Sequence, residues 1–213
     1  VERLISQLAP ACRAKVADDV AELEAFAQQT EGTDFKLAAW DLDYYAERLK
    51  KAKYDLNEAD LKPYLVLDSV LKNGVFYAAN QLYGLTFKPR PDIPVYADGV
   101  QVYEVFDQDN TPMALFYTDY FRRPTKTGGA WMSNFVQQST LFGTKPVIYN
   151  VCNFEAPAKG APAFLTSSDV ETLFHEFGHA LHGLFASQKY ETLSGTNTPR
   201  DFVEMPSQFN EHW

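Results

Sequence analysis

The chain has 213 residues, of which 46% are hydrophobic and 15% aromatic. This length and composition predict a folded domain with a substantial core and exclude a disordered chain. The net charge of −9, from 28 acidic and 19 basic residues, argues against a nucleic-acid partner, which would require a basic surface. The sequence contains no run of about 18 apolar residues, so no membrane-spanning segment is expected.

Residues 1–90 are expected to be a helical segment. Apolar residues recur at helical spacing between Leu4 and Ala27, with acidic residues on the other side of the helix. Pro10 is expected to interrupt or kink this helix, because proline lacks a backbone N–H and its ring crowds the preceding turn.

Two more helices are expected in this segment, over residues 38–53 and 65–83, and Gly84 is the expected end of the second. The side chains expected on the inner face of the helix over 38–53 are Trp40, Tyr44 and Leu49.

The apolar period changes to two after residue 90, which indicates strands. The expected strands cover 95–96, 100–106, 114–120 and 146–154, and residues 107–111 form the turn of an antiparallel hairpin. Helices, then strands, then helices predict an α+β fold that is mostly helical with a small antiparallel sheet. Residues 91–213 would form a second segment, made of this sheet and the helices that follow it and continuous with 1–90 in one domain.

The stretch 122–129 is expected to be a basic, flexible loop. Its glycines, Gly128 and Gly129, would let backbone approach a bound peptide closely, although an ordinary turn is the commoner use of such a pair.

Two cysteines, Cys12 and Cys152, lie far apart and outside any C-x-x-C pattern. They are expected to be buried free thiols in a reducing compartment. Because the sequence begins without a signal peptide, the expected location is the cytoplasm.

The motif H-E-x-x-H is formed by His175, Glu176 and His179. Residues four apart on a helix project from the same face, about 6 Å apart along the axis, so both imidazoles can reach one metal ion. Glu176 would contact a metal-bound water as general base, and zinc is the expected ion. A buried core helix with hydrogen-bonded histidines is the alternative interpretation.

A capping box of Ser168 and Glu171 is expected to start this helix. Another histidine, His182, lies seven residues after His175 and therefore about 10 Å along the axis. It is too distant for the same ion and is expected to make a supporting or core hydrogen bond.

The third metal ligand is expected on a following helix, with Thr198 as its N-cap. Glu204 lies one turn inside that helix, and its apolar neighbours argue for a partly buried carboxylate. Two weaker candidates are Asp201, which suits a cap better, and Glu211, which lies two turns further along.

Several stretches together resemble the thimet oligopeptidase family of zinc metallopeptidases. They are HEFGHALHGLF (175–185), LSGTNTPRDFVE (193–204) and PSQ (206–208), with the upstream stretches 82–87, 128–132 and 143–147. Within the family, 194–204 is most similar to bacterial peptidyl-dipeptidases.

The resemblance implies that His175, His179 and Glu204 bind one zinc ion and that Glu176 is the general base. It also implies that residues 91–213 are a zincin-like catalytic core with a zincin-like metal helix, part of a larger peptidase catalytic domain. It implies short peptides as substrates, with dipeptides released from the C-terminus. Family members are longer, so this chain is expected to be a central fragment whose partners include the missing N- and C-terminal parts of the enzyme.

The alternatives are an oligopeptidase with endopeptidase specificity, a metal-binding fragment that is catalytically incomplete, and a non-enzymatic interaction domain. Substrate backbone is expected to add to a strand edge, either around Trp131–Ser133 or around Val147–Asn153.

Overall fold

The structure is a computed structural model that describes residues 1–55 and 58–213. It forms two compact units, Val1–Asp60 and Leu61–Trp213, which are described separately below. The division expected from the sequence, a helical segment 1–90 and a catalytic core 91–213 within one domain, stays a prediction.

The first unit contains two long helices, α1 (Glu2–Glu31) and α2 (Leu42–Tyr54). The 3₁₀ turn η1 (Ala39–Asp41) lies between them in the chain. α1 continues through Pro10, so the interruption expected there does not occur. Tyr45 is buried and packs edge-on against Phe35, with ring centroids 5.5 Å apart.

The inner face predicted for the second helix is wrong at two of its three residues. Trp40 is 85% exposed and Tyr44 is 59% exposed, whereas Leu49 is partly buried. Trp40 belongs to a separate 3₁₀ turn that precedes α2, and within α2 it is Tyr45, rather than its neighbour Tyr44, that is buried.

The second unit contains the remaining helices. They are α3 (Glu58–Leu61, which begins just before the boundary), η2 (Lys62–Tyr64), α4 (Leu67–Ser69), the π-helix η3 (Val70–Val75), α5 (Phe76–Tyr83), α6 (Ser167–Leu184), η4 (Glu191–Leu193) and α7 (Arg200–Asn210). The helix expected over 65–83 is thus built from α4, η3 and α5. Gly84 ends it in the left-handed conformation, at φ 73°, as predicted.

The sheet has five strands in the order β1-β2-β3-β5-β4. They are β1 (Thr86–Pro89), β2 (Gln101–Phe106), β3 (Pro112–Phe121), β4 (Trp131–Val136) and β5 (Val147–Phe154). The predicted hairpin of β2 and β3 is confirmed. β1 was not expected, and residues 95–96 lie outside the strands.

The expectation of an antiparallel sheet holds for three of the four strand pairs, but β3 and β5 are parallel. The chain leaves β3, passes over the position that β5 later occupies, and forms β4 at the edge of the sheet. β5 then returns between them. The connection over residues 122–130 therefore lies beside the ends of two central strands, and the fold is a mixed α/β arrangement.

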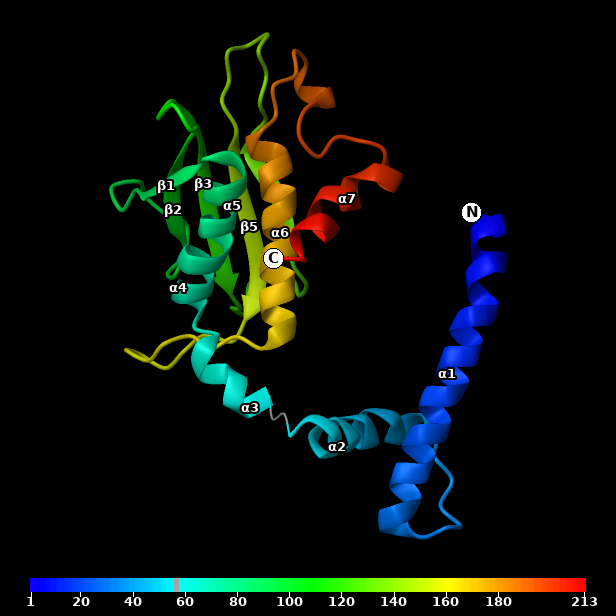
Figure 1. Ribbon diagram of the computed structural model, residues 1–213. Coiled ribbons are helices and arrows are strands. Elements are labelled where there is room, and N and C mark those ends of the chain that lie inside the picture. The colour runs from blue at the N-terminus through cyan, green and yellow to red at the C-terminus, as the bar shows by residue number, and fades with distance from the viewer. Residues whose placement is uncertain (56–57) are drawn as a thin grey trace. The chain divides into compact units, whose positions relative to one another are not determined.

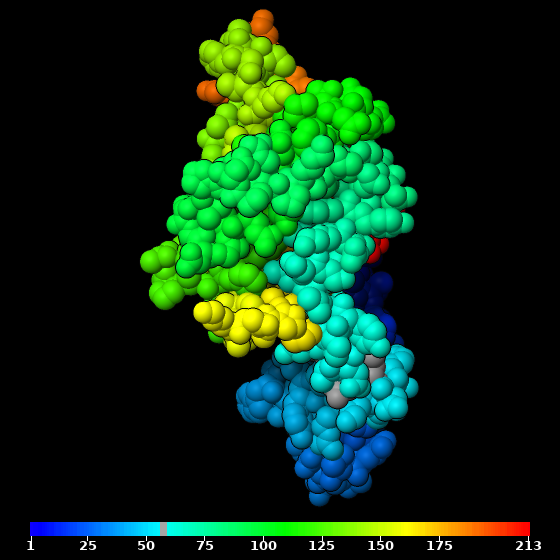
Figure 2. Space-filling model, turned by 90° about the vertical axis from the view of Figure 1, so that its left-hand side faces the viewer, coloured from blue at the N-terminus to red at the C-terminus, as the bar shows by residue number. Residues whose placement is uncertain are grey.

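α5 and α6 lie side by side on one face of the sheet (Figure 1). Aromatic rings join the layers: Phe177 of α6 lies 5.7 Å from Phe116 of β3 and 6.0 Å from Phe76 of α5, measured between centroids. The segment 155–165 lies along the start of α4 in Figure 2, where an isolated bridge pairs Val66 with Phe164.

The two cysteines differ in environment. Cys152 is buried in the core, as predicted, but Cys12 is exposed on α1, which corrects the expectation for that residue. Among the described residues, no helix combines the length and the apolar character needed to cross a membrane.

Candidate metal centre

α6 carries the H-E-x-x-H motif and begins with a capping box. Thr166 accepts a hydrogen bond from the backbone N–H of Asp169, and the Asp169 carboxylate accepts one from the backbone N–H of Thr166. The predicted box of Ser168 and Glu171 is therefore two residues too late. The run Thr166-Ser167-Ser168 offers three possible caps, and sequence pattern alone could not choose among them.

The rotation of α6 is set by its apolar face. Leu173, Phe177, Ala180 and Leu184 are fully buried against the sheet. His175 and His179 are only partly buried, and the Nε2 atoms of both lie near Glu204 of α7. Burial of the apolar residues thus decides where the two imidazoles point.

α7 packs closely against α6 because the contact is made by small and polar residues. A Cβ atom on Gly178 would lie 2.6 Å from the Cα of Ser207, so only glycine allows this approach. The Nδ2 of Asn210 donates to the carbonyl of Phe174. α7 begins after Pro199 and has no side-chain cap, so the predicted N-cap at Thr198 is wrong.

Three side chains from these helices converge. Glu204 Oε2 lies 3.3 Å from His175 Nε2 and 3.1 Å from His179 Nε2. One nitrogen or oxygen atom from each of the three residues lies within 4.8 Å of the others, a grouping that could hold a metal ion. The Glu204 side chain is 51% exposed, more than its apolar neighbours in the sequence had suggested.

The weaker ligand candidates lie outside this group. Asp201 is exposed in the first turn of α7. Glu211 contacts the other nitrogen of the first histidine: its Oε1 lies 2.6 Å from His175 Nδ1. A carboxylate at Nδ1 holds that nitrogen protonated and leaves the Nε2 lone pair facing Glu204.

Glu176 is buried, and its Oε2 has no hydrogen-bond partner among the described residues. Burial raises the pKa of the Glu176 carboxyl to about 7; the nearby His175 lowers it and Glu204 raises it further. The Nδ2 of Asn150, from β5, donates to the Glu176 backbone carbonyl at 2.9 Å and ties this turn of α6 to the sheet.

The electrostatics of Glu204 and His179 differ. Partial burial opposes ionisation of Glu204, but hydrogen bonding by Ser207 and the two imidazoles outweigh it and lower its pKa. Burial lowers the pKa of His179, although the Glu204 carboxylate opposes this shift. Both shifts favour a neutral imidazole beside a carboxylate, the forms in which these groups bind metals.

The grouping opens into a cavity of about 390 Å³. Its lining residues are Ala130, Trp131, Met132, His175, Glu176, His179, Thr196, Val203 and Glu204. The first residues of β4 therefore form one wall. β4 is an edge strand, whereas β5 is paired on both sides, so Val147–Asn153 is excluded as the free edge and Trp131–Ser133 remains.

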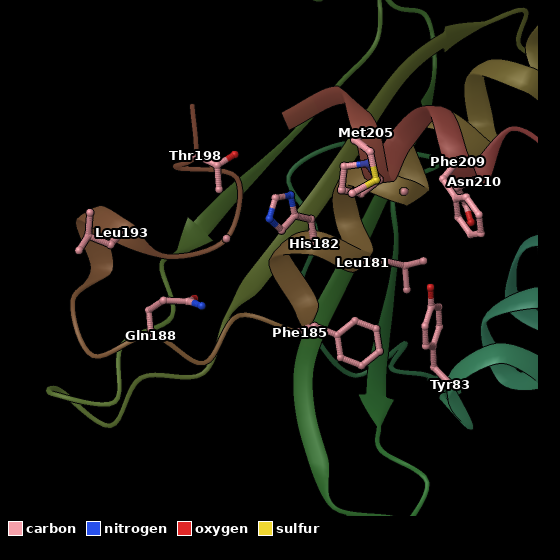
Figure 3. A pocket seen from close by; sticks show the side chains of 13 residues that line it. Tyr83, Leu181, His182, Phe185, Gln188, Leu193, Thr198, Met205, Phe209 and Asn210 are labelled. Atoms are coloured by element: carbon pink, nitrogen blue, oxygen red, sulfur yellow. The ribbon is translucent and has the colours of Figure 1, made fainter. Parts of the chain in front are cut away.

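A second cavity, of about 400 Å³, lies along another face of α6 (Figure 3). Tyr83 and Phe185 meet edge-on there, with centroids 5.1 Å apart. His182 lines this cavity, and its buried Nδ1 has no partner among the described residues, so the expected supporting hydrogen bond is not made.

The residues that sequence reasoning missed are those that hold the ligands in place. Ser207 donates to Glu204 Oε2 at 3.0 Å, and Gln137 donates to the carbonyl of Ser194 at 2.9 Å, which ties the α6–α7 loop to the end of β4. Gly178, Ser207 and Asn210 form a pattern of small and polar residues along facing helices, which could have indicated a close helix contact.

Two histidines and a carboxylate on adjacent helices, with a buried glutamate and an edge strand beside them, are the arrangement of a metal-dependent hydrolase. The chain belongs to Peptidase family M3, whose profile matches residues 1–213. The resemblance to the thimet oligopeptidase family is thereby confirmed.

Among its relatives, the dipeptidyl carboxypeptidase of Escherichia coli (strain K12) is 57% identical over 207 residues, which is 97% of this chain and 30% of that protein. The dipeptidyl carboxypeptidase of Salmonella typhimurium is 58% identical over 206 residues, with the same coverage. Oligopeptidase A of Escherichia coli is 39% identical over 213 residues, 98% of this chain and 31% of that protein. The chain thus spans about a third of the length of these relatives.

Proposed function

We propose that this chain carries the catalytic centre of a zinc-dependent metallopeptidase that releases dipeptides from the C-termini of short peptides. The observation that carries the proposal is the convergence of His175 Nε2, His179 Nε2 and Glu204 Oε2 beside the buried carboxyl of Glu176. Membership of a peptidase family supports it.

The donor set fits zinc. Two imidazole nitrogens and one carboxylate oxygen are the protein ligands of many catalytic zinc sites, which leave the fourth position open. Ligand atoms about 2.0–2.1 Å from a tetrahedral ion lie about 3.3 Å apart, close to the observed separations of 3.1 and 3.3 Å. These two separations fit the ion, and all three ligand atoms lie within 4.8 Å of one another.

Bound zinc would lower the pKa of a coordinated water to about 7 and polarise the scissile carbonyl. Glu176 would take the proton of that water and deliver it to the leaving amine. The buried Oε2 of Glu176 has no hydrogen-bond partner among the described residues, so it is available to accept that proton. Asn150 fixes the backbone of Glu176, and Glu211 fixes the ring of His175.

The substrate peptide would lie along β4. β4 has an unpaired edge, and its residues Trp131 and Met132 line the cavity. An extended peptide can add to such an edge through main-chain hydrogen bonds, which brings its backbone past the ligand group. Release of dipeptides is proposed because the relatives with 57% and 58% identity are dipeptidyl carboxypeptidases.

An endopeptidase that cleaves within oligopeptides is the second candidate, favoured by the 39% identity to oligopeptidase A. A third candidate is a metal-binding fragment without turnover, because the chain spans about 30% of the length of its relatives. Short peptides and the remaining parts of such an enzyme are the proposed partners. A cytoplasmic location stays a prediction.

Metal content and turnover test the proposal together. The zinc-loaded protein should bind one equivalent of zinc, and His179→Ala should abolish that binding. Glu176→Gln should retain zinc but lose hydrolysis of a quenched peptide, by about 100-fold or more, because the general base is removed. Failure to bind zinc at any pH would overturn the proposal.

Peptide ends distinguish the two specificities. A dipeptide-releasing enzyme should cleave a free-acid peptide and leave its C-terminally amidated form largely intact, with dipeptides as products by mass spectrometry. Equal cleavage of both forms at internal bonds would favour the oligopeptidase, and zinc binding without cleavage of either would favour the incomplete fragment.

A further inference from the structure

The connection between β3 and β4, residues 122–130, is anchored at two points rather than flexible. The first anchor is Lys126, whose side chain is 4% exposed. Its ammonium donates to the backbone carbonyls of Asp119 at 3.0 Å and Phe121 at 2.8 Å, both in β3, and to the carbonyl of Cys152 in β5. One side chain of the connection thus joins the ends of two central strands.

The charge of Lys126 is balanced in place. Its Nζ lies 3.1 Å from Oδ1 of Asp119, which is 5% exposed. The same carboxylate accepts two hydrogen bonds from Arg123, at 2.7 and 2.8 Å, and one from Tyr96 at 3.0 Å. A buried ammonium is retained only with such partners, because an unpaired charge would be expensive to bury.

The second anchor is Asn153, on β5. Its Nδ2 donates to the carbonyl of Thr127 at 2.9 Å and to the carbonyl of Gly129 at 2.8 Å. These two bonds hold the connection immediately before Ala130, where it reaches the cavity that contains His175, Glu176, His179 and Glu204.

The anchored stretch leads directly into the proposed substrate edge. Ala130, Trp131 and Met132 line the cavity, and β4 is held in the sheet by β5 alone. Gly128 and Gly129 have open space around them, and Gly129 takes a φ of +95°, so packing of these glycines does not fix the backbone. The backbone of residues 127–129 is therefore held by the hydrogen bonds from Asn153 and by the anchored side chain of Lys126, whereas Ala130 and Met132 also pack against the core.

We propose that Asn153 and Lys126 are positioning residues for the peptidase reaction: they hold residues 127–132 in place, so that the edge of β4 is ready to pair with a peptide backbone. The inference rests on the proposed function. Neither side chain lines the cavity, and α6 is held to the sheet separately through Asn150. Loss of the anchors should therefore weaken substrate binding more than it slows chemistry.

Asn153→Asp tests this anchor most directly, since a carboxylate has the shape of the amide but no N–H to donate. In the zinc-loaded protein, amide hydrogen exchange over residues 127–133 should become about tenfold faster, while β1 and β2 remain unchanged. KM for a quenched peptide should rise about tenfold with kcat within twofold, and zinc content should stay at one equivalent. Asn73→Asp, an equivalent change on an exposed residue of η3, should alter neither measurement.

Lys126→Met should increase amide hydrogen exchange and KM in the same way and by a larger factor. The matched control in the same loop is Arg122→Met, because the ion pair of Arg122 with Glu155 is exposed. If Lys126→Met does not fold, Asn153→Asp decides alone. Provided that the wild type hydrolyses the peptide, the inference would be overturned by unchanged amide hydrogen exchange in Asn153→Asp or by a fall in kcat at constant KM.

If the wild type does not hydrolyse the peptide, the proposed function is overturned, and the role of Asn153 and Lys126 in substrate positioning is overturned with it.

Discussion

At the scale of single residues, the contact between Glu211 and His175 has a direct consequence for metal binding. The carboxylate lies 2.6 Å from Nδ1, on the side of the ring away from Glu204. It orients the ring and fixes the tautomer. In the proposed zinc site, Glu211 would therefore support a ligand rather than act as one.

We expect Glu211→Gln to lower zinc affinity about 10–100-fold, which is typical of the loss of a partner to a ligating histidine. Competition with a chromophoric chelator measures this directly. Glu155→Gln, at an exposed position, is the control and should keep wild-type affinity. Unchanged affinity in Glu211→Gln would show that the ring is oriented by packing alone.

Asp119 makes the free energy of unfolding depend on pH in the acid range. Burial would raise its pKa, but hydrogen bonds from Arg123, Lys126 and Tyr96 outweigh burial, so the pKa of Asp119 is lowered from its ordinary value. A carboxyl with a lowered folded-state pKa stabilises the protein above its unfolded-state pKa, and this stabilisation disappears as pH falls through the folded-state pKa.

Asp119→Asn should therefore lose about 3–5 kcal/mol of unfolding free energy at pH 7, because the buried ammonium of Lys126 is left without a counter-charge and the partly exposed Arg123 loses its partner. Below about pH 4, the wild type should approach the variant as Asp119 becomes protonated. Urea unfolding at several pH values measures the difference, with Asp98→Asn as an exposed control. A constant difference from pH 7 to pH 2 would contradict this account.

At the scale of elements, the contact of α6 with α7 decides whether Glu204 reaches the two histidines. A Cβ atom at Gly178 would lie 2.6 Å from Ser207 Cα and 2.9 Å from the carbonyl oxygen of Pro206. Both are backbone atoms, so the helices must separate to accept a methyl group.

Gly178→Ala should move Glu204 away from His175 and His179 and lower zinc affinity at least about tenfold. Overpacking of this kind costs about 1–3 kcal/mol, against roughly 1 kcal/mol gained from alanine's higher helix propensity. Zinc titration and thermal unfolding measure the two effects. Gly74→Ala is the matched control, since its nearest contact is a side-chain ring atom of Phe174 at 3.4 Å. Equal affinity in both variants would refute the close-contact argument.

At the scale of the whole molecule, metal binding should contribute to stability because the ligands come from two separate helices. They can be close together only in the folded state, so zinc binds that state preferentially. Zinc at about 100 times its dissociation constant would add about 2.7 kcal/mol.

We therefore expect chelation to lower the melting temperature of the wild type by several degrees and to leave His179→Ala unchanged. Differential scanning calorimetry in zinc-saturated and chelator-containing buffer measures the shift. An identical melting temperature in both buffers would show that the unfolded chain binds zinc equally well or that no zinc is held.

The sequence alone determined those parts of the molecule that depend on local rules. Helical spacing places His175 and His179 on one face of α6, and alternation with a turn-forming run predicts the hairpin of β2 and β3. The motif and its surrounding runs were specific enough to indicate the family. Local chemistry was less decisive at helix starts, where neighbouring Ser and Thr residues could serve equally well as caps.

Only the tertiary structure decided how the elements meet. Strand order depends on pairing between distant segments, so the parallel pair of β3 and β5 and the free edge of β4 are not visible in any local pattern. The same is true of the contacts Glu211–His175, Lys126–Cys152 and Asn153–Thr127, since each joins residues 26 or more apart in the chain. Sequence spacing determines which residues share a helix face, but packing of the core determines which other elements that face contacts.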